Sequence, residues 1–173
     1  MVSAADRVRG LRTGRRIALA AIFEADFGQR TANAILERHL AETEGDPSAA
    51  ALARSLVATV VSQRDRIDER IGETAPQYPV VQLARMDRAL LRTAIGEVLH
   101  SPTPARVAIA EWVELARIYS GDPMRRLMNG VLGRISTEST GVEAPASIPE
   151  EGVSGHDLRT TQEARRRATR RRG

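Results

Sequence analysis

The chain has 173 residues, with 26 basic and 22 acidic side chains, three histidines and no cysteine. The lack of cysteine excludes disulfides, thiol nucleophiles and thiolate metal sites, and three scattered histidines offer no convincing metal-ligand cluster. No run approaches the roughly 18 apolar residues of a membrane helix, and the first residues lack the apolar stretch of a signal peptide. We therefore expect a cytoplasmic protein that needs neither a metal nor a cofactor and does not enter a membrane.

The basic residues are all arginines, and they are unevenly distributed. Residues 1–30 carry a net charge of +3, residues 31–155 carry −4, and residues 156–173 carry +5. Basic ends around an acidic body are typical of a protein that holds a polyanion, because arginine clusters neutralise phosphates. On charge alone, an ordinary solvated surface is an equally good interpretation.

Apolar residues recur with helical spacing wherever a period is legible, and no window alternates as a strand does, so the predicted class is all-α. The first predicted helix covers residues 15–27 and ends before Gly28, a residue suited to the left-handed position after a helix. Thr31 can cap a second helix that runs to about residue 42.

Asp46 and Pro47 predict the start of a long third helix, since a carboxylate can cap it and proline is tolerated at the first helical position. We expect this helix to stop at Gly72. Pro76 and Pro79 then forbid a regular helix across residues 75–79. Two helical segments follow this loop, a short turn over residues 80–83 and a helix over residues 86–100.

The last two predicted helices start at Pro104 and at Asp122-Pro123, which repeats the combination of a capping acid and a proline. Trp112 lies on the apolar stripe of the first of them and is assigned to the core. The second runs to about residue 135 and includes Asn129-Gly130, where Gly130 is expected to let a neighbouring backbone approach closely.

The domain organisation follows from the change in composition after residue 136. Residues 1–10 are expected to be a flexible N-terminus, and residues 11–136 to form one helical domain. Residues 137–173, rich first in Ser, Thr, Gly, Pro and Glu and then in Arg, have too little apolar surface to offset their ordering entropy. We expect them to be a disordered basic tail.

Two segments carry a resemblance to a known family. The run Val107-Ala-Ile-Ala-Glu-Trp-Val-Glu-Leu-Ala-Arg117 is followed by Leu127-Met-Asn-Gly-Val-Leu132, and upstream lies Asp87-Arg-Ala-Leu-Leu-Arg-Thr-Ala-Ile-Gly-Glu97. These segments resemble the last helices of the NusB family of transcription antitermination factors. The resemblance covers about residues 10 to 135.

The resemblance implies an all-helical fold of about seven helices in two small packed bundles. It also implies binding of the single-stranded boxA element of RNA together with NusE, a protein of the small ribosomal subunit, to help RNA polymerase read through terminators in an antitermination complex. Some similar proteins are homodimers, so a homodimer is a further possible state.

Candidate binding residues follow from the same resemblance. In the family, arginines at the start of the first helix contact RNA, and the matching residues here are Arg12, Arg15 and Arg16. An arginine in a first helical turn opposes the helix dipole, which favours a bound anion as its explanation. Arg125 and Arg126, near the start of the last helix, are further candidates for phosphate contacts.

The expected surface for NusE includes Asp87, which matches the family's acid at the start of its helix, and Asp122 as a second residue. Glu97 and Glu111 could form a catalytic carboxylate pair, but no nucleophile, histidine or glycine-rich phosphate loop accompanies them. We therefore expect no enzymatic activity. A methyltransferase carrying a NusB-like domain is disfavoured as well, because the chain lacks both a methyl-donor motif and a cysteine.

An alternative function is a NusB-like protein-interaction module that has lost specific RNA binding. Three departures from the family pattern, at Ala110, Pro123 and Leu127, keep this alternative open. With five aromatic residues in the chain, base stacking can contribute little to recognition.

Overall fold

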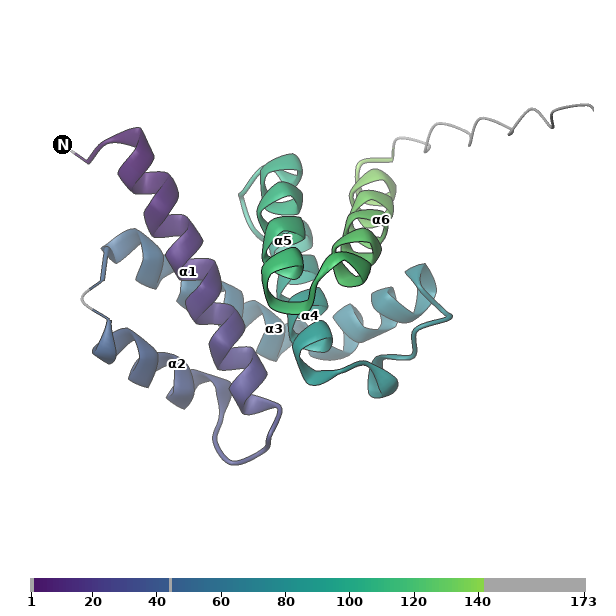
Figure 1. Cartoon of the computed structure of the whole chain (residues 1–173), viewed down its shortest axis with the longest axis horizontal. Helices are drawn as coiled ribbons and strands as arrows, with labels where there is room; N and C mark the ends of the chain where they lie inside the picture. The colour runs from purple at the N-terminus through teal and green to yellow at the C-terminus, as the bar shows by residue number, and fades with distance from the viewer. Residues whose placement is uncertain (1, 44, 142–173) are drawn as a thin grey trace, which may run out of the picture.

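A computed structural model of the protein describes residues 2–43 and 45–141, and within them the regular secondary structure is helical. The all-α prediction is confirmed. Six α-helices and one short 3₁₀ turn follow each other along the chain (Figure 1), namely α1 (Ala4–Ala25), α2 (Ala32–Glu42), α3 (Pro47–Thr74), η1 (Val80–Gln82), α4 (Arg85–His100), α5 (Ala105–Ser120) and α6 (Asp122–Ser139).

The helices form two small bundles that share the long helix α3. Helices α1 and α2 pack on each other and on α3, whereas α4 packs on α3, α5 and α6. In Figure 1, α1 crosses in front of α3, and α5 and α6 stand side by side to the right of α1. Helix α1 also contacts α4, so the two bundles meet along α1, α3 and α4.

One continuous apolar core runs through both bundles. Its apolar side chains follow the three- and four-residue spacing that the sequence shows, and Trp112 is fully buried among them, as predicted. The largest buried side chains are Trp112, Leu19, Ile35, Leu36, Leu56, Ile67, Ile71, Leu90, Leu91, Ile95, Met128 and Leu132.

Several predicted helix ends are confirmed by their capping contacts. The Thr31 hydroxyl accepts the amide N–H of Ala34 at 3.2 Å, and the Asp46 carboxylate accepts that of Ser48 at 2.8 Å. Gly28 has a φ of 77°, the left-handed conformation expected just past α1. Asp122, by contrast, does not cap α6, because Gly121 with a φ of 91° holds the cap position and Asp122 is the first helical residue.

The first helix begins at Ala4, well before the predicted start at Arg15. Ser3 caps it through the amide N–H of Asp6 at 3.1 Å, so Ala4–Gly10 of the predicted flexible N-terminus are helical. At the other end α6 continues to Ser139, so the first residues of the predicted tail are helical. The remainder of that prediction, from residue 142 onward, lies outside the described residues.

The close approach of two backbones occurs at Gly14, where α1 crosses α3. A Cβ atom at Gly14 would lie 2.6 Å from the carbonyl oxygen of Ala49, closer than real Cβ contacts come. Gly130 lies inside α6 as predicted, but it is exposed and a Cβ there would meet no atom within 4 Å. The expectation of a close backbone approach at Gly130 is therefore wrong.

Candidate nucleic-acid interface

The three candidate arginines of α1 have different environments. Arg12 and Arg16 are exposed, whereas Arg15 is only 2% exposed and points into the protein. Residues 12 and 16 are one turn apart and share a stripe of the helix, but Arg15 lies on the stripe of Ala18, Leu19 and Ile22, which faces the core. In this conformation the Arg15 guanidinium is buried and not accessible to a phosphate, so the structure does not support Arg15 as an RNA contact.

Arg15 instead belongs to a buried polar cluster that joins three helices, which we call the Arg15–Glu97–Trp112 cluster. The Arg15 guanidinium donates to both oxygens of Glu97 on α4, at 3.0 and 2.7 Å. The indole N–H of Trp112 on α5 donates to the same carboxylate at 2.6 Å. Glu97, with no exposed surface, is thus satisfied by two donor residues, as a buried charge must be.

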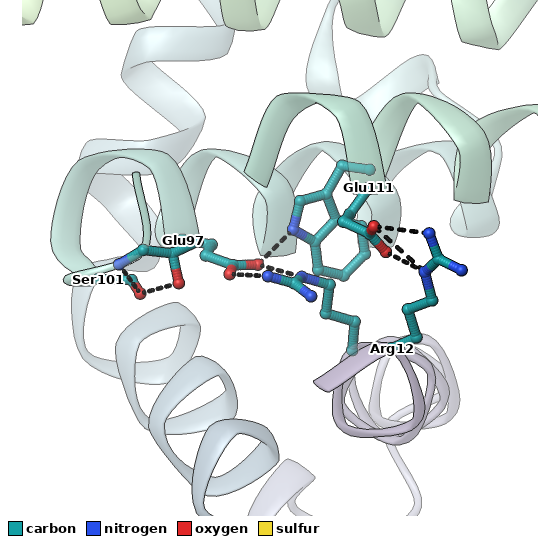
Figure 2. A network of polar contacts seen from close by, with 7 residues as sticks. Arg12, Glu97, Ser101 and Glu111 are labelled. Carbon is teal, nitrogen blue, oxygen red and sulfur yellow. Dashed lines mark hydrogen bonds and ion pairs between the residues drawn. The ribbon is translucent and has the colours of Figure 1, made fainter. Parts of the chain in front are cut away.

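Arg12 lies one turn before Arg15 and pairs with Glu111 at the surface (Figure 2). Its Nε donates to the two carboxylate oxygens of Glu111 at 3.2 and 2.9 Å, and its Nη2 donates to one of them at 3.1 Å. The hydrogen bonds and charge of Glu111 raise the pKa of Arg12 above its ordinary value. Both members of the carboxylate pair considered from the sequence, Glu97 and Glu111, are thus bound by arginines of α1.

A groove of about 450 Å³ lies between α1 and α5 beside this pair. Arg12 and Arg16 line it from α1, and the lining from α5 is given by Ala110, Glu111, Glu114, Leu115 and Ile118. Arg16 forms no ion pair within residues 2–43 and 45–141. Its guanidinium is therefore available to an external anion.

Arg125 and Arg126 extend this surface onto the first turns of α6. The Arg125 Nε donates to Asp122 at 3.0 Å, and this hydrogen bond lowers the pKa of the Asp122 carboxyl. Arg126 is exposed and, like Arg16, has no ion pair in the part of the chain that the structure describes.

Glu114 connects the two groups of arginines. The hydrogen bonds from Arg117 lower the pKa of its carboxyl, and the fields of Arg12 and Arg125 act in the same direction. Arg12, Arg117 and Arg125 therefore all act on one carboxylate, and Arg16 beside the groove and Arg126 near Asp122 complete one surface. We call this surface the basic face, and it comprises Arg12, Arg16, Arg117, Arg125 and Arg126.

The two residues predicted to bind the protein partner lie in different settings. Asp87, in the first turn of α4, is half-buried and accepts a hydrogen bond from the Ser120 hydroxyl at the end of α5. Asp122 is exposed and engaged by Arg125, within the basic face. The structure thus pairs Asp122 with Arg125, one of the predicted RNA-binding residues, and bonds Asp87 to Ser120 at the end of α5.

An apolar groove of about 310 Å³ lies between α1 and the residues that precede Asp87 and Ser120 in the chain. Met86 and Tyr119, the chain neighbours of Asp87 and Ser120, line it together with Phe23 and Phe27 of α1. Phe27 is 52% exposed, and the Arg85 guanidinium lies 4.4 Å from the centre of its ring. An exposed aromatic ring beside apolar and charged groups is a composition typical of protein-binding surfaces.

The described residues contain no group of three or more histidine, aspartate or glutamate side chains placed to hold a metal ion. Of the helices that the structure describes, none combines the length and the apolar character needed to cross a membrane.

Sequence reasoning missed the ion-pair partners, because Arg15–Glu97 and Arg12–Glu111 join residues far apart in the chain. One signal for Arg15 was present in the sequence, since this residue stands three, four and seven positions before Ala18, Leu19 and Ile22. A charge on an apolar stripe requires a buried partner. With the helix taken to start at Arg15, this arginine was instead interpreted as a first-turn residue that binds an anion.

Comparison with known proteins identifies the family. The model of the NusB family matches residues 12–137. The chain is 39% identical over 126 residues to the transcription antitermination protein NusB of Dehalococcoides mccartyi, covering 72% of this chain and 88% of that protein.

Solved structures show the same fold. NusB of T. maritima has a TM-score of 0.68 at 30% identity, covering 73% of this chain and 90% of that one. A structure of the antitermination factors NusB and NusE with dsRNA has a TM-score of 0.66 at 23% identity, and the match covers 75% of this chain and 98% of that one. From its sequence match, its helical fold and these relatives, the chain belongs to the NusB family.

Proposed function

We propose that this chain is a transcription antitermination factor that binds single-stranded boxA-type RNA together with NusE, as part of an antitermination complex on RNA polymerase. The observation that carries the RNA-binding role is the basic face, where arginines of three helices meet and Arg16 and Arg126 have no ion pair among the described residues. Membership of a family whose relatives are named transcription antitermination proteins supports the same role.

The mechanism that fits this surface is tethering. Arginine side chains hold RNA phosphates by charge-assisted hydrogen bonds and release counterions, and no covalent bond is made or broken. Trp112, the largest aromatic side chain, is fully buried and hydrogen-bonded to Glu97. An RNA base cannot stack on this buried ring, so phosphate contacts contribute more to the affinity than Trp112 does.

NusE is proposed to dock at Asp87 and the apolar groove beside it. The groove lies next to the basic face, because Arg16 lines both it and the groove between α1 and α5. A partner seated there would extend the RNA-binding surface. In the related structure, NusB and NusE occur together with dsRNA, which supports joint binding by the two proteins.

The proposed role places the protein in the cytoplasm, where bacterial RNA polymerase transcribes, and it requires no enzymatic activity of this chain.

The proposal is tested by measuring the affinity of the full chain for a labelled single-stranded boxA RNA at low salt, with and without purified NusE. We expect binding that tightens when NusE is present, and weaker binding to an RNA of the same composition in scrambled order. Binding to NusE without measurable RNA binding would instead support the protein-interaction module. Binding to neither would contradict the proposed function.

A further inference from the structure

Glu111 occupies the part of Arg12 that a phosphate would use. An arginine guanidinium offers two parallel N–H groups, which fit the two oxygens of a carboxylate and two oxygens of a phosphate equally well. In the free protein the Nε and Nη2 groups of Arg12 are both bonded to Glu111. The Arg12 side chain is otherwise open, with 60% of its surface exposed, compared with 18% for Glu111.

The position of Glu111 is fixed by the buried cluster beneath it. Trp112, the next residue on α5, is anchored to Glu97, and Glu97 is anchored to Arg15, one turn after Arg12 on α1. Helices α1 and α5 are therefore held with Arg12 opposite Glu111 (Figure 2). Because the helices are already ordered, forming the surface pair costs only side-chain entropy, and Glu111 is a persistent competitor for Arg12.

We propose that Glu111 sets the RNA affinity of the basic face by occupying Arg12 in the free protein, so that an RNA phosphate must displace its carboxylate. This inference rests on the proposed function and names an internal competitor at its site. Glu114 adds to the effect, because its charge also acts on Arg12. The consequence is selectivity, since a polyanion that contacts Arg12 alone gains little binding free energy after it displaces Glu111. An RNA that also engages Arg16 and the partner protein can displace Glu111.

The test is the isosteric substitution Glu111→Gln in the full chain, with a labelled single-stranded boxA RNA titrated at several salt concentrations. Removing the competing charge should tighten binding about two- to five-fold at low salt, the range that corresponds to one exposed ion pair. The dependence of log Kd on log salt should steepen by up to about 0.7, because Arg12 then neutralises a phosphate without releasing a carboxylate. In an Arg12→Ala background the same substitution should give a smaller gain.

The matched control is Glu37→Gln, which changes the net charge equally and frees Arg54, an exposed arginine outside the basic face. Glu37 accepts from Nε and Nη2 of Arg54, both at 2.9 Å, so the pair has the same two-pronged geometry. We expect its RNA affinity to equal that of the wild type.

Equal tightening by both glutamine variants would overturn the inference, since the cause would then be net charge. An equal gain with and without Arg12 would also overturn it, because Glu111 would act by repulsion alone. RNA binding by the wild type with no change in Glu111→Gln contradicts this inference and leaves the proposed function standing, whereas no binding by either protein contradicts both.

Discussion

The guanidinium of Arg15 and the carboxylate of Glu97 form a buried, two-pronged ion pair that ties α1 to α4 across the junction of the two bundles. Arg15 therefore has a structural role, although the family resemblance implies that it contacts RNA. The pair also fixes the helix whose exposed stripe carries Arg12 and Arg16.

Replacing Arg15 by Met should destabilise the fold by about 3–5 kcal/mol, because the Glu97 charge would remain buried with only the Trp112 N–H as a donor. Urea denaturation measures this free energy of unfolding. The double variant Arg15→Met with Glu97→Gln should recover part of the loss, since a neutral amide can still accept from Trp112. A single variant as stable as the wild type would contradict the burial of this pair.

The two glycines Gly14 and Gly130 should respond oppositely to substitution by alanine. At Gly14 the new Cβ would collide with the Ala49 backbone, so we expect a loss of about 1–3 kcal/mol. At Gly130 the space is open and alanine favours the helix, so we expect a gain of about 0.5–1 kcal/mol. A Gly14→Ala variant as stable as the wild type would show that α1 does not approach α3 as described.

Asp87→Asn should weaken binding to NusE while changing RNA binding by the isolated chain much less, because Asp87 follows Met86, which lines the apolar groove, and is bonded to Ser120 rather than to an arginine of the basic face. Titration calorimetry with NusE and RNA titration without it separate the two effects. As a control, Ser120→Ala removes the hydrogen bond to Asp87 but retains its charge, and should reduce NusE affinity less. Undiminished NusE affinity in Asp87→Asn would place the partner elsewhere.

The sequence was sufficient to predict much of the fold. Local signals identified the caps at Thr31 and Asp46 and the core position of Trp112, because turn chemistry and helical period act over a few residues. The cap at Asp122 was predicted wrongly, since Gly121 can adopt the positive φ that the turn between α5 and α6 requires. Gly130 was assigned a packing role that the structure gives to Gly14.

The candidate site was predicted less completely, because it depends on contacts between distant helices. The family resemblance identified the arginine-rich segment, but only the full length of α1 shows that Arg12 and Arg16 share one stripe and that Arg15 faces the core. Arg12 pairs with Glu111 and Arg15 with Glu97 because of the way α1 crosses α5 and α4. No pattern within a single helix specifies that crossing.

The most direct test of RNA binding by the basic face compares two double variants in the salt dependence of their affinity for single-stranded boxA RNA. Arg16→Ala with Arg126→Ala removes the two exposed arginines of this face that have no ion pair among the described residues. Arg64→Ala with Arg66→Ala removes two exposed arginines of α3, which likewise have none there.

We predict that the first double variant binds more weakly and that its slope of log Kd against log salt falls by roughly 0.7 for each RNA phosphate that the protein no longer neutralises. The α3 variant should keep the slope of the wild type. Equal slopes and equal affinities for the two variants would contradict RNA binding at the basic face.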